Sequence, residues 1–305
     1  MRTSLSILLA ALTFAALLPA TLQAETLGDF YIVEVTLFTH DNPENANEEL
    51  WRKDISLRYP EPLAFLSKEA PNTIYPQLPT LVRQAQNEAL PEDTEIVEEE
   101  PTTQTTDHVG PVFLPILDKS WQRHGGAAAS IAGSSRYSVI YRQSWLQKMD
   151  NEKNAPHVVI QAGKVQSGIH EIGGTLQIFR ERYLQLRTNL WKVSFASGTD
   201  NGSATAQQEV MQESSWPLPP QLLIPDVKTT RQAIKEGSFR GVLPAPVPSS
   251  ATNAINRIVT LQEKRKMRSR EVHYIDHPLL GMLIEIRPYR PDPPASGKPV
   301  TTKKQ

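Results

Sequence analysis

The sequence predicts an α+β fold: a mostly antiparallel sheet with a few flanking helices, a disordered acidic insertion and proline-rich loops. Segments with strand character outnumber helical ones and follow one another without strand–helix–strand alternation. The 25 Pro against 15 Gly indicate that much of the chain runs in loops or extended segments. With 39% hydrophobic residues in 305, the chain is still apolar enough to bury a sizeable core.

Strands are expected where β-branched and aromatic residues gather. Residues 30–38 (FYIVEVTLF) form an apolar run whose only charge is Glu34, which indicates a strand buried on both faces. Residues 137–145 alternate in polarity, and residues 174–195 predict two antiparallel strands around the charged turn 180–182. Three more strands are expected at 255–261, 270–275 and 279–286, the first two flanking a basic run as a hairpin.

Helical spacing of apolar residues predicts helices over 78–85 and 112–131. A short helix is expected over 226–236, with Asp226 as its N-cap residue. Residues 51–62 and most of 197–250 are interrupted by Pro and are interpreted as irregular.

The first 24 residues have the layout of a cleavable signal peptide. Arg2 precedes an apolar stretch, 5–18, which is shorter than the roughly 20 residues that span a bilayer, and cleavage is expected after Ala24. The mature protein is therefore expected in the periplasm, as a single domain over 25–290 with no transmembrane segment. An exported chain without Cys suits an oxidising compartment.

Two stretches are expected to be disordered. Residues 87–109 are acidic and Thr-rich, and they hold too little apolar area to offset the entropy of ordering them. We interpret this insertion as a solvated spacer rather than a specific acidic ligand. The tail, 291–305, is rich in Pro and Lys and has almost nothing to bury.

Composition and motifs exclude several chemistries. A chain without Cys has no disulfide, no thiolate metal site and no Cys nucleophile. The sequence contains no G-x-S-x-G, Walker A, G-x-G-x-x-G or H-E-x-x-H motif. A formal net charge of -1 creates no field that would attract nucleic acid. We therefore expect neither a cofactor nor an enzyme activity.

Residues 273–277 (HYIDH) form a cluster of side chains of the kind found in metal and catalytic sites. A metal held by His273, Asp276 and His277 would make the protein a wall-modifying enzyme. On a strand, however, His273 and Ile275 share a face and His277 lies in the following turn, which Asp276 and Pro278 suit because Asp bonds its own backbone and Pro fixes φ. We favour the turn.

The sequence feature that most directly suggests binding is a basic run. It places five cations within seven residues: Lys264, Arg265, Lys266, Arg268 and Arg270. Such a run could meet the carboxylates of cell-wall peptides or lipid phosphates. It could equally be the solvated face of an edge strand, or pair with the acidic insertion. The candidate ligand-binding set is this run together with His273, Tyr274 and Trp216, a Trp in a Pro-rich loop that is expected to expose its ring.

Two stretches together resemble a known family. They are residues 174–191 (GTLQIFRERYLQLRTNLW) and 266–281 (KMRSREVHYIDHPLLG), the second closing on Pro288-Tyr289. With the signal peptide and the strands at 31–35 and 137–145, the chain resembles the CsiV family of gammaproteobacterial envelope proteins. It departs from the family pattern at Gln185 and Leu280, where the family usually has His and Phe.

The resemblance implies a periplasmic, peptidoglycan-binding accessory protein that is needed for cell shape. It also implies association with an outer-membrane lipoprotein that activates a class A penicillin-binding protein. It implies no catalytic residues. A structural assembly factor that contacts only proteins is the remaining alternative.

Overall fold

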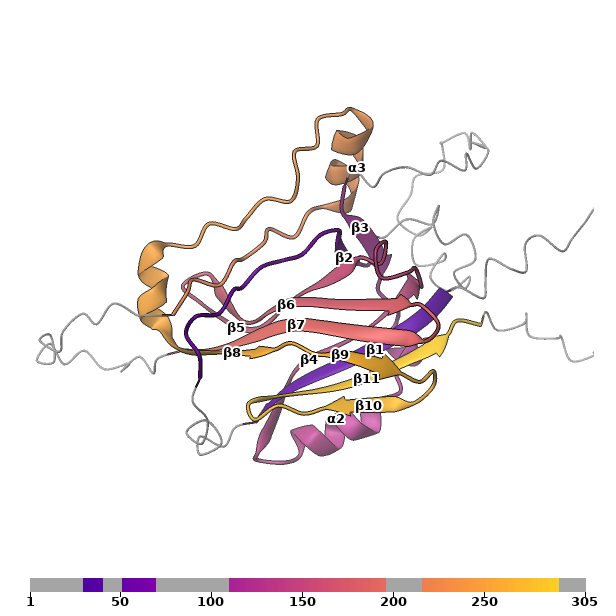
Figure 1. Cartoon of the computed structure of the whole chain (residues 1–305), viewed down its shortest axis with the longest axis horizontal. Helices are drawn as coiled ribbons and strands as arrows, with labels where there is room; N and C mark the ends of the chain where they lie inside the picture. The colour runs from indigo at the N-terminus through magenta and orange to yellow at the C-terminus, as the bar shows by residue number, and fades with distance from the viewer. Residues whose placement is uncertain (1–29, 41–50, 70–109, 196–215, 291–305) are drawn as a thin grey trace, which may run out of the picture.

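The computed structural model describes residues 30–40, 51–69, 110–195 and 216–290. Within them, the strands form two sheets (Figure 1). The four-stranded sheet has the order β10-β11-β1-β4, and each neighbouring pair is antiparallel. Its strands are β10 (Val272–Ile275), β11 (Leu280–Pro288), β1 (Phe30–His40) and β4 (Tyr137–Lys148).

The seven-stranded sheet has the order β3-β2-β5-β6-β7-β8, and β9 pairs with β7 beyond the end of β8. It is antiparallel except at β2, which runs parallel to both β3 and β5. Its strands are β2 (Leu63–Ser67), β3 (Val112–Pro115), β5 (His157–Gln166), β6 (Ile169–Arg180), β7 (Leu184–Phe195), β8 (Ile255–Leu261) and β9 (Lys264–Met267).

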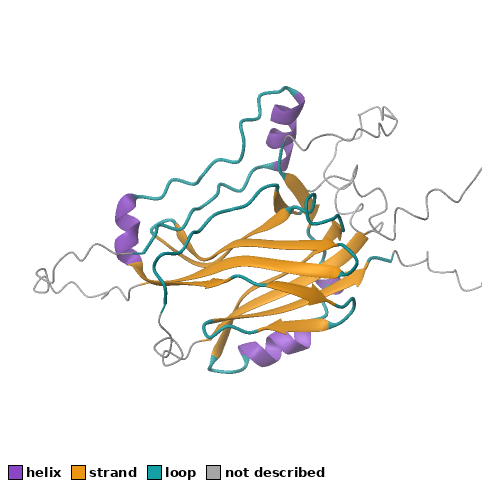
Figure 2. Ribbon diagram, in the orientation of Figure 1, coloured by secondary structure: helices purple, strands orange, loops and turns teal. Residues whose placement is uncertain are grey.

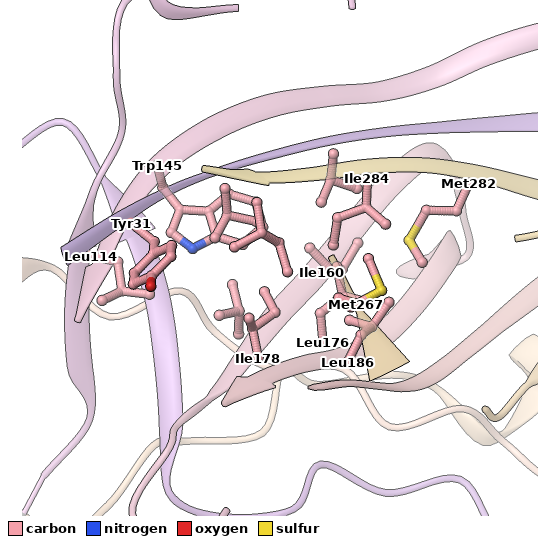
Figure 3. Close-up of a cluster of buried hydrophobic side chains, with 14 of the residues drawn as sticks. Tyr31, Leu114, Trp145, Ile160, Leu176, Ile178, Leu186, Met267, Met282 and Ile284 are labelled. Atoms are coloured by element: carbon pink, nitrogen blue, oxygen red, sulfur yellow. The ribbon is translucent and has the colours of Figure 1, made fainter. Parts of the chain in front are cut away.

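The main core lies between the two sheets (Figure 3). Strand alternation directs Val33 and Val35 of β1 into it, and both are fully buried. They meet residues such as Leu176 and Leu186 from the other sheet. Trp145 is also fully buried, and its indole Nε1 donates to Gln147 Oε1 at 3.0 Å. The apolar positions of the predicted strands therefore fill one interface between layers.

The two α-helices of the described residues lie at the periphery of the sheets (Figure 2). They are α2 (Gly125–Ala132) and α3 (Val227–Lys235), and two 3₁₀ helices are η3 (Lys119–Trp121) and η4 (Ser249–Ala254). The predicted cap of α3 is confirmed, because Asp226 Oδ1 accepts from the Thr229 amide at 2.8 Å. Within the described ranges, no helix has the length and apolar character to cross a bilayer.

A buried charged cluster fastens the segment before α2 to the outer face of the four-stranded sheet. Glu34 lies opposite Glu285 in the β1–β11 pairing, and both are buried. Arg287 separates the two charges, at 3.1 Å from Glu285 and 3.6 Å from Glu34. The Glu34 carboxylate also accepts from the amides of Arg123 and His124 at 2.6 and 2.9 Å. The charge in the otherwise apolar first strand thus holds a crossing segment in place.

The structure fits the predicted α+β class broadly, with two packed sheets of mostly antiparallel strands. The predicted helix over 112–131 is wrong: Val112–Pro115 is β3, and only Gly125–Ala132 is α-helical. Pairing of β3 with β2 outweighs the helical spacing in the first part of this segment. Pro115 ends β3, and α2 begins only at Gly125. The predicted helix at 78–85, the signal peptide, the acidic insertion and the tail lie outside the described residues.

The predicted basic hairpin is also wrong. β8 and β9 belong to the seven-stranded sheet, whereas β10 pairs with β11 in the other sheet. The connection at 268–271 therefore crosses from one layer to the other. Arg270 has φ 67, and its amide donates to the carbonyl of Ile286 at 2.9 Å.

Candidate binding groove

The segment 51–60 runs over the outer face of the seven-stranded sheet (Figure 1). Its alternate residues Ile55, Leu57 and Tyr59 pack against a buried cluster that contains Trp191. The Tyr59 and Trp191 rings meet edge-on with centroids 5.1 Å apart. The side chains between these positions are exposed: Asp54, Ser56 and Arg58. The segment behaves as an extended strap with one apolar and one polar side.

An open groove of about 800 Å³ lies between this strap and strands β7, β8 and β9. We call it the β7 groove. The strap contributes Arg52, Asp54, Ser56 and Arg58, the sheet contributes His157, Thr175, Arg187, Asn189 and Thr260, and the β8–β9 connection contributes Gln262, Glu263 and Lys264. Among the described residues that line it there is no Phe, Tyr or Trp.

Hydrogen bonds that side chains make with other side chains and with the backbone fix the walls of the β7 groove. Asn189 Nδ2 donates to the Arg58 carbonyl at 2.9 Å and thereby joins β7 to the strap. Gln262 Nε2 donates to Asn189 Oδ1 at 3.0 Å, and the Glu263 amide donates to Thr188 Oγ1 at 2.8 Å. These bonds connect three separate stretches of the chain, so they hold the walls of the groove in a fixed arrangement.

The floor of the β7 groove contains two buried polar groups. Burial and the nearby Arg187 guanidinium lower the pKa of His157 to about 4, so this imidazole is neutral at pH 7. Thr175 is 1% exposed, and its Oγ1 has no hydrogen-bond partner among the described residues. A buried hydroxyl without a partner is costly, and a ligand in the groove could supply one.

The lining carries more positive than negative charge. Arg52, Arg58, Arg187 and Lys264 face two carboxylates, Asp54 and Glu263. Arg52 is already paired with Asp54, at 2.9 Å from Nε and 2.6 Å from Nη2. Such a lining suits a polar ligand with exposed carboxylates.

Arg187 and Lys264 converge at one end of the groove. Both interact with the Glu152 carboxylate: Arg187 bonds Oε1, and Lys264 Nζ lies 2.8 Å from Oε2. The two cations also lie over the Phe179 ring, at 6.0 and 5.2 Å from its centroid. A buried aromatic face and one carboxylate thus position two cations side by side.

Strand alternation divides the predicted basic run. Lys264 and Lys266 point to the outer face, where Lys264 lines the groove and Lys266 Nζ lies 3.3 Å from the centroid of the Tyr183 ring. Arg265 shares the opposite side with buried Met267, and its Nη1 donates to the Tyr274 carbonyl in the other sheet at 2.9 Å.

The other predicted site residues lie outside the groove lining. Arg268 pairs with Glu271 at 3.6 Å, and its amide donates to His273 Nε2 at 3.1 Å. Tyr274 is 46% exposed, stacks on Phe38, and donates from its hydroxyl to Asp276 at 2.5 Å.

Trp216 corrects a prediction. Its ring is partly buried against the Trp191 cluster instead of exposed, and its Nε1 donates to the Asn256 carbonyl at 2.9 Å. The ring of this Trp therefore packs against an apolar cluster although it lies in a Pro-rich loop, as large aromatic side chains commonly do.

The alternative metal site is not assembled. His273 binds the backbone of Arg268, while His277 Nδ1 accepts from the Leu279 amide at 3.2 Å. In the described part of the chain, the group with ligand atoms close enough for a metal is instead Glu34, His124 and Glu285. There Arg287 and Arg142, at 3.6 and 3.5 Å from Glu34, already balance the carboxylates. The geometry therefore favours an ion-pair network.

Sequence reasoning missed Arg58, Arg187 and Asn189. They are scattered over two segments, and no linear motif joins them. The signal available for Arg58 was the alternation of residues 52–59 (RKDISLRY), which marks an extended strap with one polar side.

Comparison with known proteins gives one match. A sequence model of the family described as "Peptidoglycan-binding protein, CsiV" matches residues 4–289. Comparison with curated proteins and with solved structures found no match.

Proposed function

Since the chain belongs to the CsiV family of peptidoglycan-binding proteins, we propose that it binds peptidoglycan in the β7 groove, in the periplasm. The observation that carries this proposal is the groove itself. It is large, open, polar and rich in cations, and it is built from contacts among three separate stretches. Peptidoglycan is a polar polymer with peptide carboxylates, which such a lining can bind.

Lys264 belongs to both the predicted set and the groove lining. Lys266 follows it on the same outer face and extends the cationic surface along β9. Arg268, Arg270, His273 and Tyr274 form a second, weaker contact in this proposal, because a polymer as long as a glycan strand can reach past the end of the groove.

We further propose that binding is non-catalytic and that it supports cell-wall synthesis and cell shape. The predicted signal peptide and the single domain over 25–290 are part of this proposal, and so is a partnership with a lipoprotein that activates a penicillin-binding protein. The non-catalytic role is supported by the geometry of 273–277: His273 lies in β10 and His277 just before the turn to β11, and both imidazoles bond backbone groups.

Sedimentation with purified sacculi tests the proposal. Protein of residues 25–305 is expected to pellet with sacculi, and the triple variant Arg58→Gln/Arg187→Gln/Lys264→Gln should stay mostly in the supernatant. The matched control is Arg268→Gln/Arg270→Gln, which changes two cations outside the groove and should bind within about threefold of wild type.

Two outcomes would contradict the proposal. If wild-type protein remains in the supernatant, peptidoglycan binding is wrong. If the double variant loses binding while the triple variant keeps it, the site is the 268–271 connection and the β7 groove is wrong.

A further inference from the structure

We infer that the β7 groove binds the peptide stems of the wall polymer through their carboxylates and that Glu152 holds the same cations until a ligand carboxylate replaces it. This inference rests on the proposed function and goes further, because it names the part of the polymer that is recognised and a competing group within the protein.

The lining chemistry separates peptide from glycan. Sugar rings present apolar C–H faces that pack well on aromatic side chains, and the described lining of the groove offers no Phe, Tyr or Trp. The nearby rings of Tyr59 and Trp191 pack against each other under the strap. Guanidinium, ammonium and carboxylate groups line the space instead, and these match the carboxylates and amines of a peptide stem.

The shape of the groove also suits an extended peptide. The strap presents Asp54, Ser56 and Arg58 on one side, and β7 presents Arg187 and Asn189 on the other. Asp54 and Glu263 can receive an amine, and the cations can receive carboxylates. The unpartnered hydroxyl of Thr175 in the floor can bond a peptide group.

Arg187 and Lys264 show directly that they can hold a carboxylate between them. Each contacts a different oxygen of Glu152, with Lys264 Nζ at 2.8 Å. The two cations thus form a bridging site of the kind that binds carboxylates well. The Glu152 side chain is 35% exposed, so it can leave this position without opening the core.

Exchange of one carboxylate for another follows from this arrangement. A stem carboxylate that enters the groove meets the cation pair already occupied by Glu152, and it binds by taking that place. The partly exposed Glu152 side chain then turns to solvent. Glu152→Gln removes the competing charge and should therefore strengthen binding, whereas Arg187→Gln and Lys264→Gln should weaken it.

The experiment compares three forms of the wall polymer with full-length mature protein. Intact sacculi should bind. Glycan strands stripped of peptides by an amidase, and sacculi whose carboxyl groups are converted to amides with carbodiimide and excess glycinamide, should each bind at least tenfold more weakly. On intact sacculi, Glu152→Gln should bind threefold or more tightly than wild type.

Glu236→Gln is the matched control, because Glu236 is an exposed carboxylate at the end of α3, outside the groove and outside the 268–274 contact. It should bind as wild type does. Equal binding of intact, stripped and amidated material would overturn recognition of the stem while leaving the proposed function in place. Unchanged or weakened binding by Glu152→Gln would overturn the exchange. Loss of wild-type binding to intact sacculi would overturn the proposed function together with this inference.

Discussion

Glu34 is expected to be the most costly single carboxylate to neutralise. The change Glu34→Gln keeps the volume, so it creates no cavity and reports on charge and hydrogen bonding. Glu34 is fully buried, and its two oxygens accept from two backbone amides and face Arg287 and Arg142 at 3.6 and 3.5 Å.

The size of the loss follows from these contacts. An amide offers one oxygen, so one backbone N–H loses its charged acceptor, at about 1.5–3 kcal/mol. Removing one charge from a buried pair costs about 3–5 kcal/mol in total. For a domain of this size that corresponds to a fall in Tm of about 6–20 °C.

Urea and thermal unfolding of the mature protein measure this loss, and Glu271→Gln serves as the control. Glu271 makes an exposed pair with Arg268, so the same chemical change there should cost less than about 1 kcal/mol. A double variant, Glu34→Gln/Arg287→Met, should lose about 1–3 kcal/mol less than the sum of the two single variants. A cost below about 1 kcal/mol for Glu34→Gln, or strict additivity, would refute the reasoning.

Three further predictions concern the groove and the sheets. The pKa of His157 falls from 6.5 to about 4 on folding, so the unfolded chain binds the extra proton between these values and stability should decline as pH falls from 6.5 to 4. At 1.36 kcal/mol per pKa unit, His157 contributes about 3 kcal/mol to the free energy of unfolding at pH 7. Denaturant titrations at pH 7 and pH 4 should therefore show a smaller loss of stability in His157→Gln than in wild type. An equal loss in the two proteins would contradict this prediction. Gly174→Ala should destabilise by about 1–3 kcal/mol, because φ is 119 and a Cβ would overlap the Asn189 carbonyl, whereas Gly126→Ala in α2 has free space and should be neutral or stabilising; equal Tm shifts would contradict this difference. Binding to sacculi should weaken several-fold between about 0.05 and 0.5 M salt, because exposed charges are screened; salt-independent sedimentation would argue against a cationic groove.

The sequence predicted where strands form better than it predicted which strands pair with one another. The apolar run at 30–38 and the two strands around 180–182 are confirmed as β1, β6 and β7, because hydrophobic patterning is a local signal. The separation of β8 from β10 was not predictable, since both have the same strand character and the choice of sheet depends on non-local pairing. For the same reason, the parallel contact of β3 with β2 outweighed a helical pattern.

Of the residues that line the candidate groove, the sequence singled out only Lys264. Lys264 stood out because its charge has cationic neighbours in the sequence. Arg58 and Arg187 stand apart in the sequence, and they face one groove only because the strap crosses β7 and is joined to it through Asn189. Clustered charge is visible in a sequence, but charge assembled by the fold requires the structure.

The charged cluster on β1 also protects the fold against misalignment. β1 is buried on both faces at nine of its eleven positions, so burial alone would tolerate a slip of one residue. Such a slip would turn Glu34 into the layer between the sheets, away from Arg287 and the amides that now satisfy it. Because burying an unpaired carboxylate is unfavourable, the native alignment of β1 with β11 is lower in free energy than the slipped one. A single charge in a hydrophobic strand thus acts as a register mark during folding.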